Sequence, residues 1–581
     1  MNTCEYRLLK FLKNQTCINQ RELAELLGYS LGKVNASLRM LLENGYVNDE
    51  YLLTEKALHL FDQNKPKQAV ILAAGLGMRM VPINTETPKG LLEVKGERLI
   101  ERVIKQLNEV GISKITIVVG FMKERYEYLI DKYGVELIYN KEYADKNNWY
   151  SLYLVRDRLD NAYVIPCDLW CKDNPFSQEE ICSWYMVNDV ITESSNVRIN
   201  NKQELRLVNE VTEGITMIGI AYVNHDSAVY IKRRLHEMIG NRNFIQSFWE
   251  AAAVKGKKMV FYPKIVEKDD VVEINTFEEL RELDKNSNHL NSDLLNLIVE
   301  SLRCNLNDIT EIESLKKGMT NRSFRFRCKK KRYIMRVPGE GTDLMINRMQ
   351  EYDVYQIIKR LDICDPIIYL SKEKGYKITE YLEGARTCNA ENLEEVTRCM
   401  GFLKRFHQMN LNVEHTFNIF EQIEKYESYW NGEDSIFSDY LEMKHKMYEL
   451  KKFIDQQDKE WTLTHIDAVP DNFLFVKDKI YLIDWEYAGM QDPHVDIAMF
   501  AIYAMYDRDK VESLIDAYFD NACPENTRTK IYCYIAVCGF LWSNWCEYKR
   551  ICGVEFGEYS LRQYRFAKEY YKIAKERIEH E

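Results

Sequence analysis

The chain has 581 residues, too many for one hydrophobic core, so roughly two to four domains are expected. With 46% hydrophobic and 29% charged residues it has an ordinary globular composition, and a formal net charge of −11 argues against a protein that mainly coats nucleic acid. The 15 cysteines form no CxxC pair, which favours reduced thiols over a disulfide framework or zinc site. No signal core and no run near the ~20 apolar residues of a spanning helix is present, so a cytoplasmic protein without a membrane partner is predicted.

Two polar stretches, residues 62–68 and 284–289, have the composition of loops and divide the chain. No internal repeat is visible. We therefore predict three domains, over residues 1–64, 67–286 and 291–581.

The sequence of the first domain predicts several helices followed by a short β-hairpin. One helix ends in a glycine turn at Gly28, and Ser30 caps the next, in which apolar residues repeat at helical spacing up to Leu42. This pattern resembles a winged helix-turn-helix domain. The resemblance implies DNA binding through the capped helix. That helix carries only Lys33 and Arg39 as cations, so a module for interaction or self-association is the alternative.

The second domain opens with an apolar strand, residues 68–74, that is typical of a buried parallel strand. It runs into the turn Gly75-Leu76-Gly77 and then reaches Arg79 and, further on, Lys89. A Gly-x-Gly turn lets backbone N–H groups approach phosphate oxygens, and the two cations add charge for a triphosphate. The dinucleotide pattern GxGxxG is absent.

The whole pattern, A-A-G-x-G-x-R followed by P-K, resembles the sugar-nucleotide and choline-phosphate nucleotidylyltransferases. Residues 147–152 resemble an N-N-x-x-S-L stretch of the choline-phosphate cytidylyltransferases, and a later strand ends in Asp168. Residues 271–276 resemble a family segment that often reads E-I-D, with Asn275 in place of the Asp. An amide oxygen can coordinate Mg²⁺ but brings no charge, so Glu273 is the alternative metal ligand.

This resemblance implies a Rossmann-like α/β fold and in-line attack of a phosphomonoester on the α-phosphate of CTP, with pyrophosphate leaving. The residues expected to act are Lys89 and Arg79 on phosphates, Ala74, Gly75 and Gly77 on the nucleotide, Asp168 with Glu273 or Asn275 on Mg²⁺, and Asn148 and Trp149 on the substrate. Trp170, Trp249 and Glu250 are further candidates for a quaternary ammonium.

The third domain contains the pattern H-x-D-x-x-x-x-N at residues 465–472, and Asp484 follows a short apolar strand. Phosphoryl transfer needs a group that orients the attacking hydroxyl and oxygens that hold Mg²⁺. We assign Asp467 to the first task, and Asn472 and Asp484 to the second. His465 is expected to be structural.

Upstream residues complete a kinase-like pattern. Residues 318–326 predict a loop that covers the nucleotide, and Arg336 stands where a protein kinase strand presents its Lys. Glu351, on a predicted helix, is expected to pair with Arg336. Glu380 and Tyr381 have the look of the hinge between two lobes, where adenine of ATP binds.

Residues from about 310 to 575 resemble the choline/ethanolamine kinases, which implies a bilobal protein-kinase-like fold. Asp484-Trp485-Glu486-Tyr487-Ala488 resembles the family's D-[FW]-E-Y-A, and a W-x-x-W pattern follows on a later helix. Indole faces and a carboxylate suit a trimethylammonium, which cannot donate hydrogen bonds. The residues expected in the choline pocket are Trp485, Glu486, Trp542, Trp545 and Tyr559.

Together the domains predict a multidomain α/β and α+β enzyme that makes CDP-choline. ATP and choline would give phosphocholine, and CTP would then give CDP-choline, for phosphocholine decoration of surface glycans. The same two reactions on ethanolamine or another amino alcohol are one alternative. A winged-helix regulator whose enzyme-like domains only sense ligands is the other.

Overall fold

The computed structural model describes residues 1–14, 19–83, 87–200, 203–315, 321–339, 342, 345–430, 432–552 and 556–580, and of residues 78, 194, 209–211, 291 and 322 only the backbone. The chain divides into two compact units, Met1–Leu297 and Ile298–Glu581. Among the described helices, none combines the length and the apolar character needed to cross a lipid bilayer.

Four helices open the first unit: α1 (Thr3–Asn14), α2 (Gln20–Leu27), α3 (Leu31–Glu43) and α4 (Glu55–Gln63). The predicted turn is present, because Gly28 has a φ of 68° after α2 and the Ser30 hydroxyl accepts a hydrogen bond from the Lys33 N–H. Val47 and Leu53 form an isolated β-bridge as the wing. The four helices share one small apolar core, which confirms the predicted winged helix.

One buried carboxylate connects these helices to the rest of the first unit. Glu180 is 1% exposed and accepts hydrogen bonds from the hydroxyls of Tyr6 (2.6 Å) and Tyr163 (3.2 Å), while Lys10 Nζ lies 3.5 Å away. Burial, and then the charge of Glu180, raises the pKa of Tyr6 well above its usual value, so its hydroxyl remains a donor. Ile181 belongs to the apolar core of the helices.

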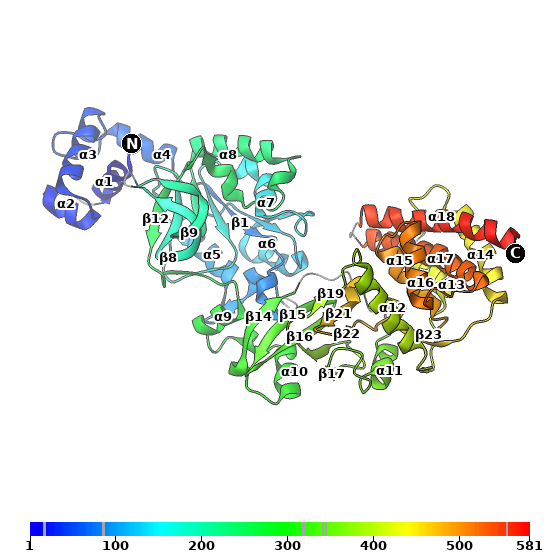
Figure 1. Cartoon of the computed structure of the whole chain (residues 1–581). Helices are drawn as coiled ribbons and strands as arrows, with labels where there is room; N and C mark the ends of the chain where they lie inside the picture. The colour runs from blue at the N-terminus through cyan, green and yellow to red at the C-terminus, as the bar shows by residue number, and fades with distance from the viewer. Residues whose placement is uncertain are drawn as a thin grey trace. The chain divides into compact units, whose positions relative to one another are not determined.

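A nine-stranded sheet forms the centre of the first unit (Figure 1). Its order is β10-β11-β9-β6-β1-β4-β5, and β8 pairs with β9 and β12. β1 is parallel to β4 and β6, whereas β6 and β9 are antiparallel. The strands are β1 (Gln68–Ala73), β4 (Ile115–Val119), β5 (Glu136–Tyr139), β6 (Ala162–Pro166), β8 (Trp184–Ile199), β9 (Leu205–Val223), β10 (Val254–Lys255), β11 (Lys258–Met259) and β12 (Tyr262–Val266).

Helices cover both faces of this sheet, as the unbroken apolar β1 predicts. Ala69, Ile71 and Ala73 point into a core shared with α5 (Leu99–Glu109) and α6 (Tyr128–Tyr133). Val70 and Leu72 point into the opposite core, shared with α7 (Asn148–Leu154) and α8 (His225–Met238). Two short strand pairs, β2 (Glu93–Val94) with β3 (Glu97–Arg98) and β7 (Leu169–Cys171) with β13 (Val271–Glu273), and then α9 (Phe277–Leu283), complete the domain.

The second unit has the bilobal fold predicted from the sequence. α10 (Asp293–Leu302) leads into a small lobe with the sheet order β14-β15-β16-β18-β17 and the helix α11 (Arg348–Ile358). These strands are β14 (Ile309–Ser314), β15 (Asn321–Cys328), β16 (Lys331–Pro338), β17 (Ile367–Leu370) and β18 (Lys377–Glu380). The predicted loop at 318–320 lies outside the described residues, and the strand that follows it is β15.

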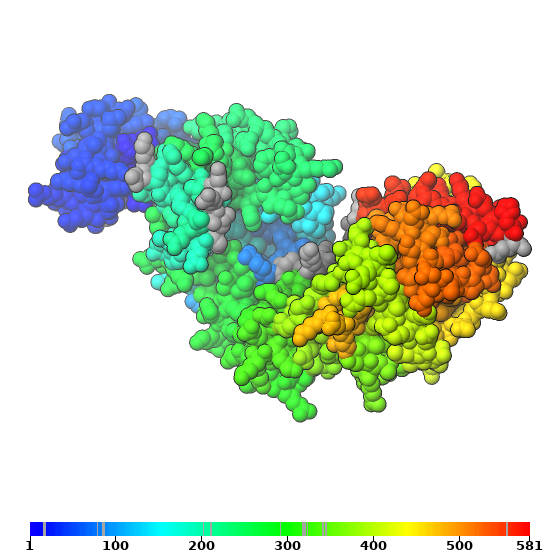
Figure 2. Space-filling model, viewed as in Figure 1, coloured from blue at the N-terminus to red at the C-terminus, as the bar shows by residue number. Residues whose placement is uncertain are grey.

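The large lobe is mainly helical, and Figure 2 shows the orange and red segments of α15 to α18 closely packed. α17 is buried along most of its length, and buried polar side chains on it are paired: Lys530 lies 2.7 Å from Asp492, and Asn544 Nδ2 donates to the Tyr440 hydroxyl (2.8 Å). The helices are α12 (Leu393–His407), α13 (Ile419–Ser428), α14 (Tyr440–Gln456), α15 (His494–Tyr503), α16 (Arg508–Phe519), α17 (Glu525–Ile551) and α18 (Glu558–His580). The strands are β19 (Arg386–Thr387), β20 (Thr462–Thr464), β21 (Phe473–Val476), β22 (Lys479–Leu482) and β23 (Gly489–Gln491).

Replacing Glu180 by Ala removes the acceptor of the Tyr6 hydroxyl, whereas the Tyr163 hydroxyl keeps the Ser177 carbonyl (2.9 Å) as its acceptor. Because an unsatisfied buried polar group destabilises a fold by about 1–3 kcal/mol, we expect the free energy of unfolding of the first unit to fall by that amount. Glu179→Ala is the matched control, since Glu179 is partly exposed and pairs with Lys13 at the surface, and should change it by about 0.5 kcal/mol or less. Scanning calorimetry of the whole chain measures both; equal shifts for the two variants would contradict the structural role of Glu180.

Candidate active sites

A cavity of about 510 Å³ lies at the carboxyl ends of β1 and β6 in the first unit. Parallel strands carry their ligand sites at this edge, because successive loops meet there. The sequence analysis expected ten residues at one nucleotide site, and nine of them line this cavity. Those on the lining are Ala74, Gly75, Gly77, Arg79, Lys89, Asn148, Asp168, Glu273 and Asn275.

The predicted cations meet at one amide oxygen. Lys89 Nζ donates hydrogen bonds to Asp168 Oδ2 (2.9 Å) and to Asn275 Oδ1 (2.8 Å), and Arg79 Nη2 donates to the same Asn275 oxygen (2.8 Å). Gly77 has a φ of 61°, and a Cβ there would lie 3.0 Å from Lys89 Cγ. Glycine therefore serves both the turn and the close approach of the lysine.

Strand pairing brings two carboxylates together. β13 runs antiparallel to β7 with Glu273 opposite Leu169, and the Ile274 N–H donates to the Asp168 carbonyl (2.9 Å). Burial, and then the charge of Asp168, raises the pKa of Glu273. Mutual repulsion of this kind is relieved by a bound cation, and hard oxygen donors suit Mg²⁺. Asp168 and Glu273 thus fit a metal ion.

The predicted substrate residues fall into two groups. Asn148 lines the cavity, with its side-chain oxygen accepting from the Trp249 N–H (2.8 Å). Trp149 and Trp249 are each 2% exposed and belong to the core, and the Trp149 indole N–H donates to the Ile245 carbonyl. The structure does not bring Trp149 into the cavity. Phe248, which the sequence analysis missed, lines it and is 63% exposed.

The other ammonium candidates lie away from the open cavity surface. Trp170 is largely buried, with Lys95 over its ring. Glu250 accepts from the Tyr185 hydroxyl (2.7 Å), and burial raises its pKa to about 7. Neither residue is on the lining of the cavity.

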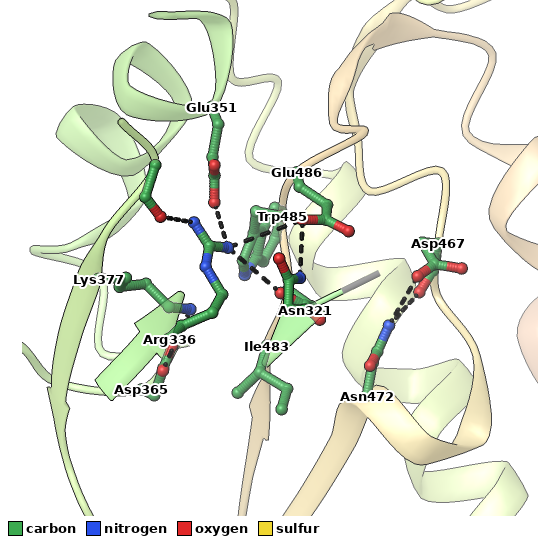
Figure 3. A network of polar contacts seen from close by, with 12 residues as sticks. Asn321, Arg336, Glu351, Asp365, Lys377, Asp467, Asn472, Ile483, Trp485 and Glu486 are labelled. Carbon is green, nitrogen blue, oxygen red and sulfur yellow. Dashed lines mark hydrogen bonds and ion pairs between the residues drawn. The ribbon is translucent and has the colours of Figure 1, made fainter. Parts of the chain in front are cut away.

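In the second unit the kinase-like loop is assembled as predicted (Figure 3). Asn472 Nδ2 donates to the Asp467 carbonyl (2.8 Å) and to its carboxylate (3.1 Å). Burial, and then the charges of Asp484 and Glu486, raises the pKa of Asp467 to about 8. These oxygens fit a Mg²⁺ site, because a cation would offset the repulsion among the carboxylates.

Asp496 fixes the backbone of this loop. Its carboxylate accepts from the N–H groups of His465 (3.1 Å) and Ile466 (2.7 Å) and lies 2.9 Å from His407 Nε2. Ile466 needs such support, since its φ is 70°, a strained value for a β-branched residue. The His465 ring contacts the Ile483 carbonyl (2.9 Å), which is consistent with a structural part.

The predicted pair of Arg336 and Glu351 is present and buried, with Nη1 and Oε1 2.5 Å apart. Burial alone would raise the pKa of Glu351, but the charge of Arg336 outweighs it and lowers the pKa. Arg336 also donates to the Gly375 carbonyl (2.9 Å) and lies 3.5 Å from Asp484. Its side chain is 4% exposed, and its guanidinium group faces the carboxylates of Glu351 and Asp484.

Glu486 was expected near the tryptophans but lies against the small lobe (Figure 3). Asn321 Nδ2 of β15 donates to its carboxylate (3.0 Å), and Arg348 Nη1 of α11 lies 3.4 Å from the same oxygen. Arg348 is also 3.1 Å from Glu351. The contacts of Asn321 and Arg348 with Glu486 were not predicted, because these partners are far apart in the chain.

Trp485 is also placed away from a ligand surface. It is 0% exposed, its indole N–H donates to the Leu482 carbonyl (2.8 Å), and its ring packs against Phe406 and His465. Trp485 therefore packs against His465 and supports the loop that carries Asp467.

A chain of aromatic rings leads from α17 to the catalytic loop. The centroid separations are 5.6 Å for Tyr487–Trp542, 5.5 Å for Trp542–Trp545, 4.9 Å for Trp545–Phe556, 6.3 Å for Phe556–Tyr559 and 6.1 Å for Tyr559–Tyr503. The Tyr503 hydroxyl then donates to Asp471 (2.8 Å). Burial raises the pKa of Tyr559 most, and Asp467 is among the charges that raise it further. The predicted Trp542, Trp545 and Tyr559 thus belong to one aromatic cluster, together with rings that the sequence analysis missed, and Tyr559 is the one of the three whose pKa the charge of Asp467 raises.

The predicted hinge residues have their backbone donors in use. The Glu380 N–H donates to the Pro366 carbonyl and the Tyr381 N–H to the Arg332 carbonyl, each at 2.9 Å. The Glu380 carboxylate pairs with Lys331 (2.9 Å). Adenine recognition at these two residues would therefore have to use carbonyl oxygens.

Three family models match the chain. Residues 1–48 match a winged helix-turn-helix DNA-binding model, residues 69–184 the MobA-like NTP transferase domain, and residues 312–536 the choline/ethanolamine kinase model. These matches follow the three folds described above.

Individual relatives are similar to separate parts of the chain. The choline-phosphate cytidylyltransferase of Streptococcus pneumoniae is 34% identical over 222 residues, 38% of this chain and 97% of that protein. The 2-aminoethylphosphonate cytidylyltransferase of Lancefieldella rimae is 30% identical over 226 residues, 37% of this chain and 91% of that protein. The crystal structure of the choline kinase LicA from Streptococcus pneumoniae is 28% identical, with 48% of this chain and 99% of that chain covered and a TM-score of 0.43. Through its central domain this chain belongs to the choline-phosphate cytidylyltransferase family, and it joins that domain to a winged helix and a choline/ethanolamine kinase domain.

Proposed function

We propose that this nucleotidyltransferase and kinase act in sequence on choline, first forming phosphocholine from ATP and then CDP-choline from CTP. One observation carries the proposal: a kinase domain and a cytidylyltransferase domain share one chain, and the product of the first reaction is the substrate of the second. Release of CDP-choline for surface glycans, and a cytoplasmic location where both nucleotides are available, remain predictions.

In the kinase step the choline hydroxyl attacks the γ-phosphorus of ATP, ADP leaves, and Asp467 receives the hydroxyl proton. Asn472 orients Asp467 through the 3.1 Å hydrogen bond. Mg²⁺, held by Asp484 and Asn472, would neutralise phosphate charge. The aromatic chain that ends beside Asp467 offers ring faces to the trimethylammonium group.

In the cytidylyl step a phosphate oxygen of phosphocholine attacks the α-phosphorus of CTP, and pyrophosphate leaves. Lys89 and Arg79 bind the triphosphate oxygens, and the Gly75–Gly77 turn lets the backbone approach them. Mg²⁺, held by Asp168 and Glu273, would add positive charge where the leaving group forms. The partly exposed Phe248 and Tyr143 of the cavity lining can face the ammonium group.

Two alternatives deserve the same assays. The relative named 2-aminoethylphosphonate cytidylyltransferase is 30% identical, so a compound with a primary amine is the second candidate substrate of the central domain.

The regulator hypothesis depends on DNA binding, yet residues 1–63 contain seven Lys and Arg against eight Asp and Glu, which does not favour a nucleic-acid surface. Mass spectrometry of products from choline, ethanolamine and 2-aminoethylphosphonate with ATP, CTP and Mg²⁺ tests the proposal; no CDP-choline from choline would refute it.

Asp467→Asn and Asp168→Asn separate the two steps. Loss of a general base slows a reaction by about 10²–10⁴-fold, so Asp467→Asn should abolish most phosphocholine formation and spare cytidylyl transfer to supplied phosphocholine. Asp168→Asn should reduce cytidylyl transfer by at least about 100-fold and spare the kinase step. Coupled assays with each substrate supplied separately measure this. If either variant lost both activities, the sites would not be independent.

Tyr559→Leu tests the aromatic chain. Loss of one cation–π contact of about 1–2 kcal/mol should raise the KM for choline roughly 5- to 30-fold, with a smaller change for ethanolamine and none in the KM for ATP. Tyr448→Leu is the control, because Tyr448 lies on α14 and contacts Glu424 and Phe420. An unchanged KM for choline in Tyr559→Leu would remove this ring from the pocket.

A further inference from the structure

We propose that Asn275 is a positioning residue that holds Lys89 and Arg79 while the site lacks nucleotide and transfers both cations to the incoming triphosphate. The proposal rests on the proposed function of this cavity as a CTP site. It assigns Asn275 to the cations and leaves metal binding to the two carboxylates.

The neighbours of Asn275 determine how its amide is oriented. Both Lys89 and Arg79 can only donate, and both lie 2.8 Å from Oδ1. The amide nitrogen can only donate, so exchanging it with the oxygen would place N–H groups against two cations. The observed orientation is therefore the one that gives both cations an acceptor.

This orientation leaves the oxygen fully occupied. A carbonyl oxygen has two lone pairs, and two donors already use them. A metal ion could reach Asn275 only after Lys89 or Arg79 had left it. Asp168 has a single cation partner at 2.9 Å, so Asp168 and Glu273 are the oxygens through which a metal ion can be held.

The neutrality of the amide explains why the cations can leave. A carboxylate at this position would form ion pairs with both Lys89 and Arg79, which adds an attraction between opposite charges that a neutral amide oxygen lacks. The Lys89 side chain is only 11% exposed, so water would screen its pair weakly, whereas Arg79 is exposed and its pair would be screened more. A triphosphate would then compete with this added protein charge for both cations. With an amide it competes for Arg79 with a neutral oxygen, and for Lys89 with that oxygen and the single carboxylate of Asp168.

The test is calorimetric titration of the full chain with CTP, once in EDTA and once in Mg²⁺. In EDTA we expect Asn275→Asp to weaken CTP binding at least about tenfold, because the new carboxylate retains both cations. Asn275→Ala should bind CTP within about threefold of the unsubstituted protein, since the cations remain and only their acceptor is lost. Gln246→Glu is the matched control: it adds the same charge to the cavity lining, where Gln246 contacts Asp145 rather than the cations, and should weaken binding less than about threefold.

Each result decides between the two roles. If Asn275→Asp matched Gln246→Glu in EDTA and tightened binding only in Mg²⁺, Asn275 would be a metal ligand and the proposal would be wrong. A large loss in Asn275→Ala would also overturn it, because the amide would then contact nucleotide directly. If the unsubstituted protein bound no CTP, the proposed function would fail instead. Near-ultraviolet circular dichroism of each variant shows whether the cavity is folded.

Discussion

Repulsion between gathered carboxylates is the constraint on which both active sites depend, and protein cations hold each set together. In the first unit Lys89 lies 2.9 Å from Asp168, and in the second Arg336 lies 2.5 Å from Glu351. Where a cation is less close the repulsion is visible, because burial and neighbouring carboxylates raise the pKa of Asp467 to about 8. In the second unit the close Arg336 thus lowers the pKa of Glu351, whereas the pKa of Asp467 is raised.

The two sites use their cations differently. Arg336 is buried, and its two terminal nitrogens donate to Glu351 and to the Gly375 carbonyl. If Arg336 moved away from Glu351, both charges would be left unpaired in the interior, which would destabilise the fold. Arg348 reinforces this framework from α11. Lys89 and Arg79 instead share the neutral oxygen of Asn275 at the wall of an open cavity. The kinase framework thus orients carboxylates permanently, whereas the cations of the cytidylyltransferase site are available to a substrate.

The parts of these sites that could be predicted from the sequence are those set by short-range geometry. The spacing of Asp467 and Asn472 places both on one loop. Gly77 lies in a turn with a positive φ, and a Cβ at this position would come too close to Lys89, so the turn requires glycine. Contacts between distant segments could not be predicted in this way. Asn321 of β15 meets Glu486, which follows β22, across 165 positions of the chain. The same limit applies to the contact of Arg348 with Glu486.

Aromatic residues show this limit most clearly, because a motif identifies a ring but not its exposed face. Trp485 belongs to a recognisable motif, yet it is 0% exposed and its ring makes edge-type contacts with Phe406 and His465. Trp542 and Trp545 are 6% and 1% exposed and pack edge to face against each other, so little of either ring can meet a cation. Tyr559, less buried and nearer the end of the aromatic chain, has more surface to offer. In the proposed choline pocket the tryptophans would therefore shape the wall and Tyr559 would contact the cation, a division of roles that depends on tertiary packing.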